Sequence, residues 1–354
     1  MSVFFCRCLL RVIFLLLFTF TEAYAQPDIS RVSVSGSLLK KHVYQLASDS
    51  LQGRETGTPG QLQAAIYCTQ SFRLSHLLAA FRLDSIRGTF RQTYAFTTTD
   101  VAVFGNTHST YKRHELVPLP LTQTDSNRVS FGHNVGGLLM GTDLKKEVVV
   151  VSAHYDHLGH SGRRVFHGAD DNASGTATVL SLAATFDSLA QQGIRPRRSI
   201  LFLLFSGEEG GLLGSAYFVY NSPIPLSQFV GDLNIDMVGR VDYPHRKKPD
   251  YCYLITGIQD SKLKRIAETA NQQSVNLSLN QGGYDTKNDP SRYFFRSDHY
   301  NFVEAGIPAL FFTNGEHADY HQISDTADKI DYPILQKRAT LVFQTAWLVA
   351  NESL

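Results

Sequence analysis

The chain has few of the features that mark specialised protein classes. It has 354 residues, four cysteines and a formal net charge of +1 at pH 7, without a low-complexity tract or an internal repeat. A charge so close to zero argues against electrostatic capture of nucleic acid or of an anionic membrane. With 43% hydrophobic and 18% charged residues, the composition is that of an ordinary globular protein with one large or two medium domains.

Cysteine is scarce beyond the N-terminal segment. Cys6 and Cys8 lie among the first 25 residues, and only Cys68 and Cys252 follow, far apart in the sequence. Two cysteines do not make a disulfide framework, and they are too few for a zinc–thiolate site. We therefore expect both to be buried as small hydrophobic residues.

One long apolar run stands out, and it lies at the N-terminus. Arg7 and Arg11 precede the stretch VIFLLLFTF (12–20), and AYA (23–25) follows it. This order is typical of a secretory signal peptide cleaved before Gln26. The run is shorter than the roughly 20 residues of a membrane span, so we expect no stable membrane insertion after cleavage. Export to the periplasm or the extracellular space is the prediction.

Cleavage would leave a nearly neutral chain that we expect to form one domain. Removal of residues 1–25 takes away two arginines and one glutamate, which leaves 31 basic and 31 acidic residues. Within the domain 26–354, we expect a helical part at about 26–85 and short strands and loops at 85–145. The chemistry-bearing core is expected at about 130–354.

The second half of the chain alternates between two kinds of apolar pattern. EVVVVSA (147–153) and SILFLLF (199–205) are continuous apolar runs, as expected for strands buried on both faces. Residues 173–189 between them have small and apolar residues at helical spacing. Further helices are expected near 37–49, 61–78, 212–220, 259–271, 298–305 and from 332, and further strands near 229–236, 251–256 and 307–312. This order predicts an α/β fold, a three-layer sandwich whose central mixed, largely parallel sheet is flanked by helices.

Imidazole and carboxylate side chains follow the predicted core strands. These residues are His154, Asp156, Asp170, Asp171, Glu208, Glu209, Asp236 and His321. The carboxyl ends of parallel strands meet at one edge of a sheet, which is where such folds place their sites. Histidine with aspartate and glutamate, and without thiols, suits zinc or a similar divalent ion. One bridging carboxylate with two ligands on each side would hold two metals roughly 3.5–4 Å apart.

Several of these residues also have ordinary structural explanations. His154 alone could be a buried structural histidine, Asp170 could cap the helix that follows, and Glu208–Glu209 could lie in a solvated loop. Neither capping nor solvation explains two carboxylate pairs beside apolar runs, and an isolated aspartate such as Asp236 is rare in a buried strand.

Other histidines compete for the ligand positions. His157, His160 and His167 lie near His154, and we rank them lower because loop histidines are usually solvated. His299 and His317 compete in the same way with His321.

Six motifs make the sequence resemble a known family. They are AHYDHLG, GADDNASG, FSGEEGGLLGS, LNIDMVGR, SDHYNF and DYHQISDT, in this order over about residues 147–330, with a weaker echo in GRETGTPG (53–60). In this respect the chain resembles the co-catalytic di-zinc aminopeptidases, metallopeptidase family 28, which include bacterial leucyl aminopeptidases. The resemblance implies the zinc-peptidase, phosphorylase/hydrolase-like fold.

The resemblance also implies a role for each matching residue. Asp170 would bridge two zinc ions, although another divalent ion could serve. His154 and Asp236 would complete one metal site, and Glu209 and His321 the other.

Four further residues would support these ligands. Glu208 would be the catalytic general base, and Asp156 would orient His154. Asp325 would support His321, and a cis peptide bond would join Asp171 to the bridging aspartate before it.

The function implied is a secreted metallo-aminopeptidase that acts on peptides with a free N-terminus, using a metal-activated water. A single-zinc glutaminyl cyclase is the enzymatic alternative, and a non-catalytic binding protein of the same fold is the other. A carboxypeptidase of the related clan would carry an inserted dimerisation domain that we do not find. Tyr284, Tyr293, Phe294 and Phe295 are candidates for an apolar substrate pocket.

Overall fold

A computed structural model describes residues 28–82, 88–102, 110–121, 129–256, 261–280, 284 and 289–353. The predicted signal peptide lies outside these residues. None of the helices among the described residues combines the length and the apolar character that a membrane crossing requires.

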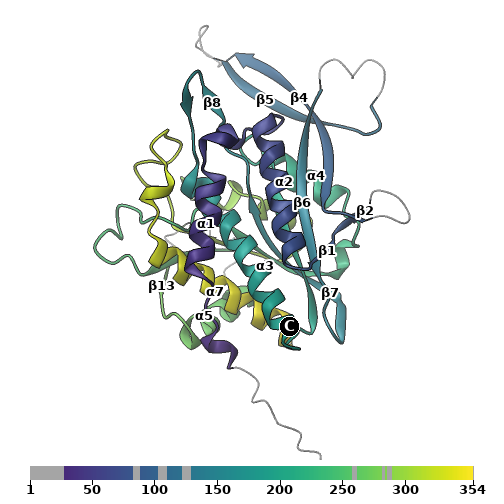
Figure 1. Cartoon of the computed structure of the whole chain (residues 1–354), viewed down its shortest axis with the longest axis vertical. Coiled ribbons are helices and arrows are strands. Elements are labelled where there is room, and N and C mark those ends of the chain that lie inside the picture. The colour runs from purple at the N-terminus through teal and green to yellow at the C-terminus, as the bar shows by residue number, and fades with distance from the viewer. Residues whose placement is uncertain are drawn as a thin grey trace, which may run out of the picture.

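A single large sheet forms the centre of the molecule (Figure 1). Among the described residues it has ten strands, in the order β13-β12-β14-β11-β7-β10-β6-β4-β5, with β1 paired to β6. The strands are β1 (Leu78–Ala79), β4 (Arg91–Ala102), β5 (Thr110–Val117), β6 (Val129–Leu139), β7 (Leu144–His154), β10 (Arg198–Phe205), β11 (Phe229–Ile235), β12 (Tyr251–Ile255), β13 (Ser278–Asn280) and β14 (Ala309–Thr313).

The middle of the sheet is parallel, which confirms the predicted fold class. β7 pairs in parallel with β10 and with β11, and β11 pairs in parallel with β14. Every residue of β10 is buried. This is the burial that a continuous apolar run predicts for a strand covered on both faces.

Helices cover both faces of the sheet. They are α1 (Gly36–Leu46), α2 (Pro59–Leu74), α3 (Gly175–Gln191), α4 (Leu213–Tyr220), α5 (Lys262–Gln273), α6 (His299–Glu304) and α7 (Tyr332–Asn351). On one face α1, α2, α3, α5 and α7 contact one another, and on the other face α4 contacts α6.

Alternate residues of the core strands supply the two hydrophobic layers. In β7, Val149 and Val151 pack with the five-helix layer, whereas Val148 and Val150 pack on the other side with Phe218 of α4. The period of two along a strand therefore fills both layers from one apolar run.

The region before the core differs from expectation. We predicted short strands and loops for residues 85–145, but β4, β5 and β6 are long antiparallel strands of 12, 8 and 11 residues. In Figure 1 the β4–β5 hairpin extends beyond the body of the sheet. Many of its residues are polar, so it lacks the continuous apolar run that identified the core strands.

The short elements and the cysteines complete the fold. Two small ladders pair β2 (Phe81–Arg82) with β3 (Gly88–Thr89) and β8 (His160–Ser161) with β9 (Arg164–Val165), and a short helical turn, η2, covers Asp49–Arg54. Cys68 and Cys252 are buried, as predicted, and they are not paired with each other.

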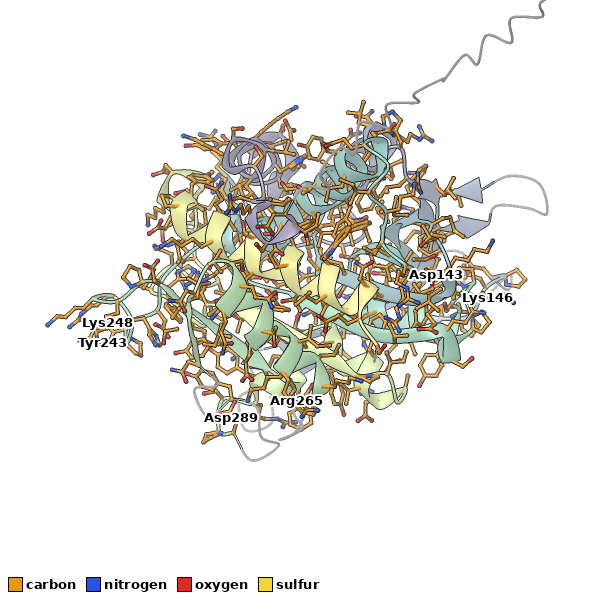
Figure 2. All side chains as sticks on the ribbon, turned by 90° about the horizontal axis from the view of Figure 1, so that it is seen from below. Asp143, Lys146, Tyr243, Lys248, Arg265 and Asp289 are labelled. Atoms are coloured by element: carbon orange, nitrogen blue, oxygen red, sulfur yellow. The ribbon has the colours of Figure 1, made fainter. Side chains whose placement is uncertain are left out.

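Charged side chains of both signs lie at the periphery. Figure 2 shows Asp143 and Lys146 at one edge of the molecule, and Tyr243 and Lys248 on a loop that projects from the opposite edge.

Candidate metal centre

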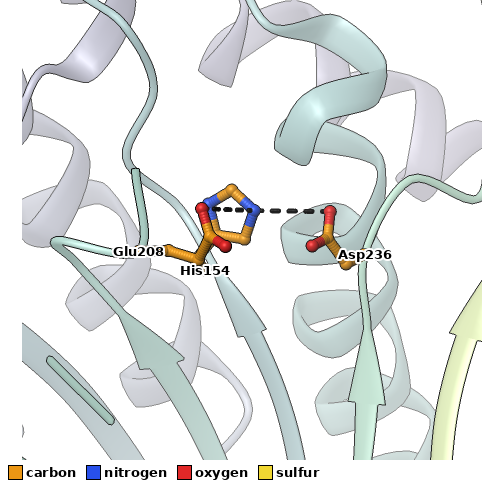
Figure 3. Close-up of side chains that lie close together, drawn as sticks. All are labelled: His154, Glu208 and Asp236. Carbon is orange, nitrogen blue, oxygen red and sulfur yellow. Dashed lines mark ion pairs between the residues drawn. The ribbon is translucent and has the colours of Figure 1, made fainter. Parts of the chain in front are cut away.

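Three of the predicted residues meet where the parallel strands end (Figure 3). His154 is the last residue of β7, Glu208 follows β10, and Asp236 comes directly after β11. The register places Phe205 of β10 beside His154, so the loops that follow these strands begin at the same level. The His154 side chain is only 1% exposed.

Asp171 lies between two groups of ligand atoms. Its Oδ1 is 3.4 Å from Nε2 of His154, which is in turn 3.3 Å from Oδ1 of Asp236. Its Oδ2 is 3.0 Å from Nε2 of His321, which is 3.3 Å from Oε2 of Glu209. We call His154 and Asp236 the inner set, and Glu209 and His321 the outer set. The two oxygens of one carboxylate thus face one set each.

These distances fit divalent metal ions. Two ligand atoms bound 2.0–2.1 Å from a tetrahedral zinc ion lie roughly 3.4 Å apart. Within the described residues, Nε2 of His154 and Oδ1 of Asp236 are buried without a hydrogen-bond partner. Buried polar atoms are normally satisfied, and a cation would satisfy these.

The acidic groups are crowded enough to need positive charge. Burial and the neighbouring Glu209 raise the pKa of Asp171. Burial also opposes ionisation of Glu209, but hydrogen bonds from His157 and His321 lower its pKa. Bound cations would keep all of these carboxylates ionised.

Asp170 does not occupy the position predicted for it. Its carboxylate accepts hydrogen bonds from the Gly239 amide at 2.6 Å and from Asn314 Nδ2 at 3.0 Å, and lies 3.1 Å from His317 Nε2. It is fully buried, and its histidine partner is His317 rather than a histidine of either ligand set. The prediction that Asp170 bridges the metals is therefore revised, and Asp171 has the bridging geometry.

The cis peptide bond is also one residue further along than predicted. It joins Asp171 to Asn172, rather than Asp170 to Asp171. The residue that precedes the cis bond is thus the one that faces both ligand sets.

Asp156 lies where an orienting carboxylate is needed. Its Oδ1 is 3.5 Å from Nδ1 of His154 and accepts a hydrogen bond from the Glu208 amide at 3.3 Å. Its Oδ2 accepts a hydrogen bond from the Thr56 hydroxyl at 3.0 Å. The same hydroxyl accepts a hydrogen bond from the Gly207 amide at 2.8 Å. Thr56 therefore connects the loop after β7 with the loop after β10.

Arg54, two residues before Thr56, stabilises the loop after β7 through hydrogen bonds to backbone carbonyls. It is fully buried and donates hydrogen bonds to the carbonyls of Tyr155, Leu46, His167 and Gly168. The sequence alone indicates no specific role for Arg54 or Thr56, although both belong to GRETGTPG (53–60), the weaker echo of the family. That turn-rich motif was the available signal.

Asp325 has partners other than the one predicted. Its Oδ2 accepts hydrogen bonds from the backbone amides of Asp170 and Asp171, at 2.9 and 3.2 Å. Burial, and next the charge of Asp170, raise the pKa of Asp325 to about 6. Asp325 thus supports the segment that carries Asp171, rather than His321.

His157 is the residue that sequence reasoning ranked too low. It is 1% exposed, and its Nδ1 lies 2.7 Å from Oε1 of Glu209 and 3.8 Å from Oδ2 of Asp171. The assumption that loop histidines are solvated was wrong for His157. His160 is exposed, and His167 lies 2.8 Å from the exposed Asp49.

The competitors of His321 are placed elsewhere. His317 pairs with Asp170, and His299 is buried with its ring stacked on Phe311 at 4.8 Å.

Glu208 lies beside the inner set. Its Oε2 is 3.9 Å from Nε2 of His154. Burial raises the pKa of Glu208 well above its usual range, and the charge of Glu209 acts in the same direction. A raised pKa makes a carboxylate a better proton acceptor.

Two cavities adjoin these residues on different sides. The narrow one, about 30 Å³, is lined by Glu208, Asp171 and Asp236 together with the apolar side chains of Met237, Tyr293 and Phe311. Of the predicted pocket residues, only Tyr293 lines it, and Tyr284 packs on Tyr293 with ring centres 4.3 Å apart. The wide one, about 280 Å³, is lined by Glu209 and His157 and by residues of the β4–β5 hairpin.

Comparisons with known proteins identify the family of the chain. The family model described as "Peptidase family M28" matches residues 134–346. Aminopeptidase YwaD of Bacillus subtilis is 31% identical over 220 residues, which cover 59% of this chain and 43% of that protein. A probable leucine aminopeptidase of Arthroderma otae is 30% identical over 219 residues, 59% of this chain and 56% of that one. The chain thus spans about half the length of the curated relatives it matches.

Solved structures share the fold. A zinc aminopeptidase from Bacillus subtilis superposes with a TM-score of 0.65 at 18% identity, covering 90% of this chain and 96% of that one. Glutaminyl cyclase of Porphyromonas gingivalis superposes with a TM-score of 0.56 at 15% identity, covering 90% and 99%. At these identities the likeness establishes the architecture.

Proposed function

Because the chain belongs to peptidase family M28, we propose that it is a zinc-dependent aminopeptidase that removes N-terminal residues from peptides. The observation that carries the proposal is the position of Asp171, whose two carboxylate oxygens lie 3.4 and 3.0 Å from the Nε2 atoms of His154 and His321. A carboxylate shared in this way is the central ligand of a hydrolytic two-metal site. The named aminopeptidase relatives support the same activity.

In this proposal His154, Asp171 and Asp236 would hold one zinc ion, and Asp171, Glu209 and His321 would hold a second. The four carboxylates of Asp171, Glu208, Glu209 and Asp236 carry a formal charge of −4, which two divalent cations would neutralise. Zinc bound here would polarise the carbonyl of the scissile peptide bond and lower the pKa of a water molecule.

Glu208 is the general base of the proposed reaction. Its carboxylate borders the narrow cavity. It accepts a proton from the attacking water and then delivers that proton to the leaving amine nitrogen. The position of Glu208 suits both steps, because its Oε2 lies 3.9 Å from Nε2 of His154, beside the inner set, and its carboxylate borders the cavity.

Asp156 and Thr56 fix the relative positions of the ligand His154 and the base Glu208. Asp156 faces Nδ1 of His154, which leaves Nε2 of that ring directed at Asp171 and Asp236. Carboxylates that orient a ligating histidine in this way fix its tautomer and ring orientation. Because Asp156 also binds the Glu208 amide, one carboxylate positions both a ligand and the base.

The substrate class follows from the narrow cavity. Met237, Tyr293 and Phe311 form apolar walls next to the acidic groups, so a small apolar side chain fits beside a free N-terminal amine. The N-terminal segment supports export of the enzyme, because its arginines, apolar run and AYA site have the order of a signal peptide.

The test compares the wild-type enzyme with Glu208→Gln in metal content and in hydrolysis. Bound zinc per chain is measured by mass spectrometry. Hydrolysis is measured with alanyl and leucyl p-nitroanilides and with their N-acetylated forms. We expect two zinc ions in both proteins, cleavage of the free-amine substrates only, and a fall in kcat on the order of 10³-fold in Glu208→Gln. Glu115→Gln, at an exposed position of β5 paired with Arg113, is the matched control and should behave as wild type.

Other outcomes would replace the proposal. One zinc ion with cyclisation of N-terminal glutamine would identify a glutaminyl cyclase, in keeping with the shared architecture. Bound zinc without turnover of any peptide would identify a binding protein.

A further inference from the structure

One wall of the wide cavity is formed by residues of the β4–β5 hairpin, which are not among the proposed metal ligands. The cavity lies between the β4–β5 hairpin and the loop that follows β10, and has a volume of about 280 Å³. Its lining includes Glu55, Phe96, Lys112, His114, Glu209 and Leu213. This cavity is larger than the narrow one and admits a short stretch of peptide chain rather than a folded partner.

The hairpin wall is anchored to the metal-binding loop. The ring of His114 packs so closely on Gly210 that a Cβ at that glycine would lie 3.0 Å from Cδ2 of the histidine. Thr98 of β4 lies 2.9 Å from Nδ1 of the same ring, and the Phe96 ring lies 5.5 Å away, edge-on. The apolar part of the wall is therefore held at a defined distance from Glu209.

Alternation along β5 divides its charged residues between two faces. Lys112 and His114 line the cavity, whereas Arg113 and Glu115 pair with each other at 2.9 Å. Lys112 is the one lysine or arginine among the described lining residues. Its Nζ lies 3.2 Å from Oε1 of Glu55, and its side chain remains 60% exposed. An ammonium group has three N–H donors, so this ion pair leaves two for a ligand.

The two cavities border adjacent glutamates. Glu208 lines the narrow cavity and Glu209 lines the wide one. An enzyme that removes one residue needs a small compartment for that residue and a larger one for the remainder of the substrate. The narrow cavity has the first property and the wide cavity the second.

We propose that the wide cavity binds the residue after the scissile bond, and that Lys112 recognises its free carboxylate, so that the enzyme prefers dipeptides. This proposal rests on the proposed aminopeptidase function. In this proposal Phe96 and Leu213 contact the side chain of the second residue, and the Lys112 ammonium at the cavity wall, which also pairs with Glu55, binds the free carboxylate.

The test compares a dipeptide with its C-terminal amide. We use Ala-Phe and Ala-Phe-amide and measure kcat/KM for each in wild type, Lys112→Ala and Arg113→Ala. We expect wild type to have a higher kcat/KM for Ala-Phe than for Ala-Phe-amide. In Lys112→Ala this ratio should fall about three- to five-fold, the size of effect expected for an exposed ion pair, and the change should lie in KM. Arg113→Ala, one residue along the strand and on the opposite face, should retain the wild-type ratio. Calorimetric binding of Ala-Phe to zinc-loaded Glu208→Gln, with and without Lys112→Ala, gives a readout that does not depend on turnover.

The outcomes separate this proposal from the proposed function. Cleavage of alanyl p-nitroanilide with an unchanged dipeptide-to-amide ratio in Lys112→Ala would overturn the Lys112 assignment alone. A preference for a basic second residue that is lost in Glu55→Gln would also overturn it, because Glu55 would then be the recognising group. Failure of wild type to cleave any free-amine substrate would overturn the proposed function itself.

Discussion

The inner and outer ligand sets differ in how the fold holds them. The inner set stands at the ends of two buried parallel strands, and the His154 side chain is 1% exposed. The outer set stands on loops, and the His321 side chain is 35% exposed with a φ of 56°. Strand ends are fixed by their neighbours in the sheet, whereas a loop depends on a few local contacts. The comparison teaches that the sheet itself fixes the ligands of the inner metal position, whereas loops at the edge of the sheet supply the ligands of the outer one.

Their supporting contacts differ in the same way. Asp236 accepts a hydrogen bond from Ser297, whose hydroxyl also accepts one from Asn234 within β11, each at 2.8 Å. Glu209 is supported by His157, which comes from the loop after β7. The inner set is therefore connected to the core, and the outer set mainly to other loop residues.

The largest expected effect comes from removing the residue that both sets share. Asp171→Asn should lose both metal ions and on the order of 10³-fold in kcat/KM, because neither set retains its bridging charge. Metal content by mass spectrometry and p-nitroanilide hydrolysis measure this.

Asp170→Asn is the matched control at the adjacent position. It should keep both metals but lose about 2–4 kcal/mol of unfolding free energy, because its hydrogen-bonded partners are left unsatisfied. Metal loss in Asp170→Asn with retention in Asp171→Asn would restore the bridge to Asp170.

A smaller effect should distinguish the two histidines. His154→Ala and His321→Ala should each bind one metal fewer and lose about 100-fold in kcat, because each removes a ligand of one metal position. Added imidazole should restore activity only in His321→Ala, because that side chain is open to solvent whereas His154 lies in a closed environment. Activity is measured with and without imidazole at saturating zinc. Equal rescue of both variants would contradict the division into an inner and an outer set.

The smallest effect is a pH dependence of the outer set in metal-free protein. Hydrogen bonds from His321 to Asp171 and Glu209 outweigh burial and raise the pKa of His321 to about 10. A raised pKa stabilises the folded state fully below the unfolded value of 6.5, and this stabilisation is lost as pH rises through 10. After discounting for exposure, we expect a loss of about 1 kcal/mol, measured by urea unfolding after chelation of metal. His321→Gln should lack this decline. Zinc binds neutral histidine and should also remove it, so a decline that persists in zinc-loaded protein would exclude His321 as its source.

The position of the site could be predicted from the sequence, but the orientation of its side chains could not. The runs 147–153 and 199–205 identified the buried strands, and the end of a parallel strand specifies which edge its next residues reach. Asp170 and Asp171 are adjacent and chemically identical. The contacts that hold Asp170 away from the ligand sets come from Gly239, Asn314 and His317, which lie far away in the sequence.

His157 and Asp325 illustrate the same limit. A histidine in a polar loop is usually solvated, and only the surrounding structure buries His157 beside Glu209. Asp325 was expected near His321, yet it binds the backbone amides of Asp170 and Asp171 instead. The long strands of the β4–β5 hairpin were likewise not foreseen, because few of their residues are buried.

The sequence by itself determined the class of fold, the edge of the sheet that carries the chemistry and the kinds of ligand gathered there. These depend on local periodicity and on residue type, which a single chain displays directly. The tertiary structure alone decided which aspartate faces both ligand sets, which histidine is buried beside them and where the second cavity lies. Each of these depends on contacts between residues far apart in the chain, and no local pattern encodes the direction in which a side chain finds such a partner.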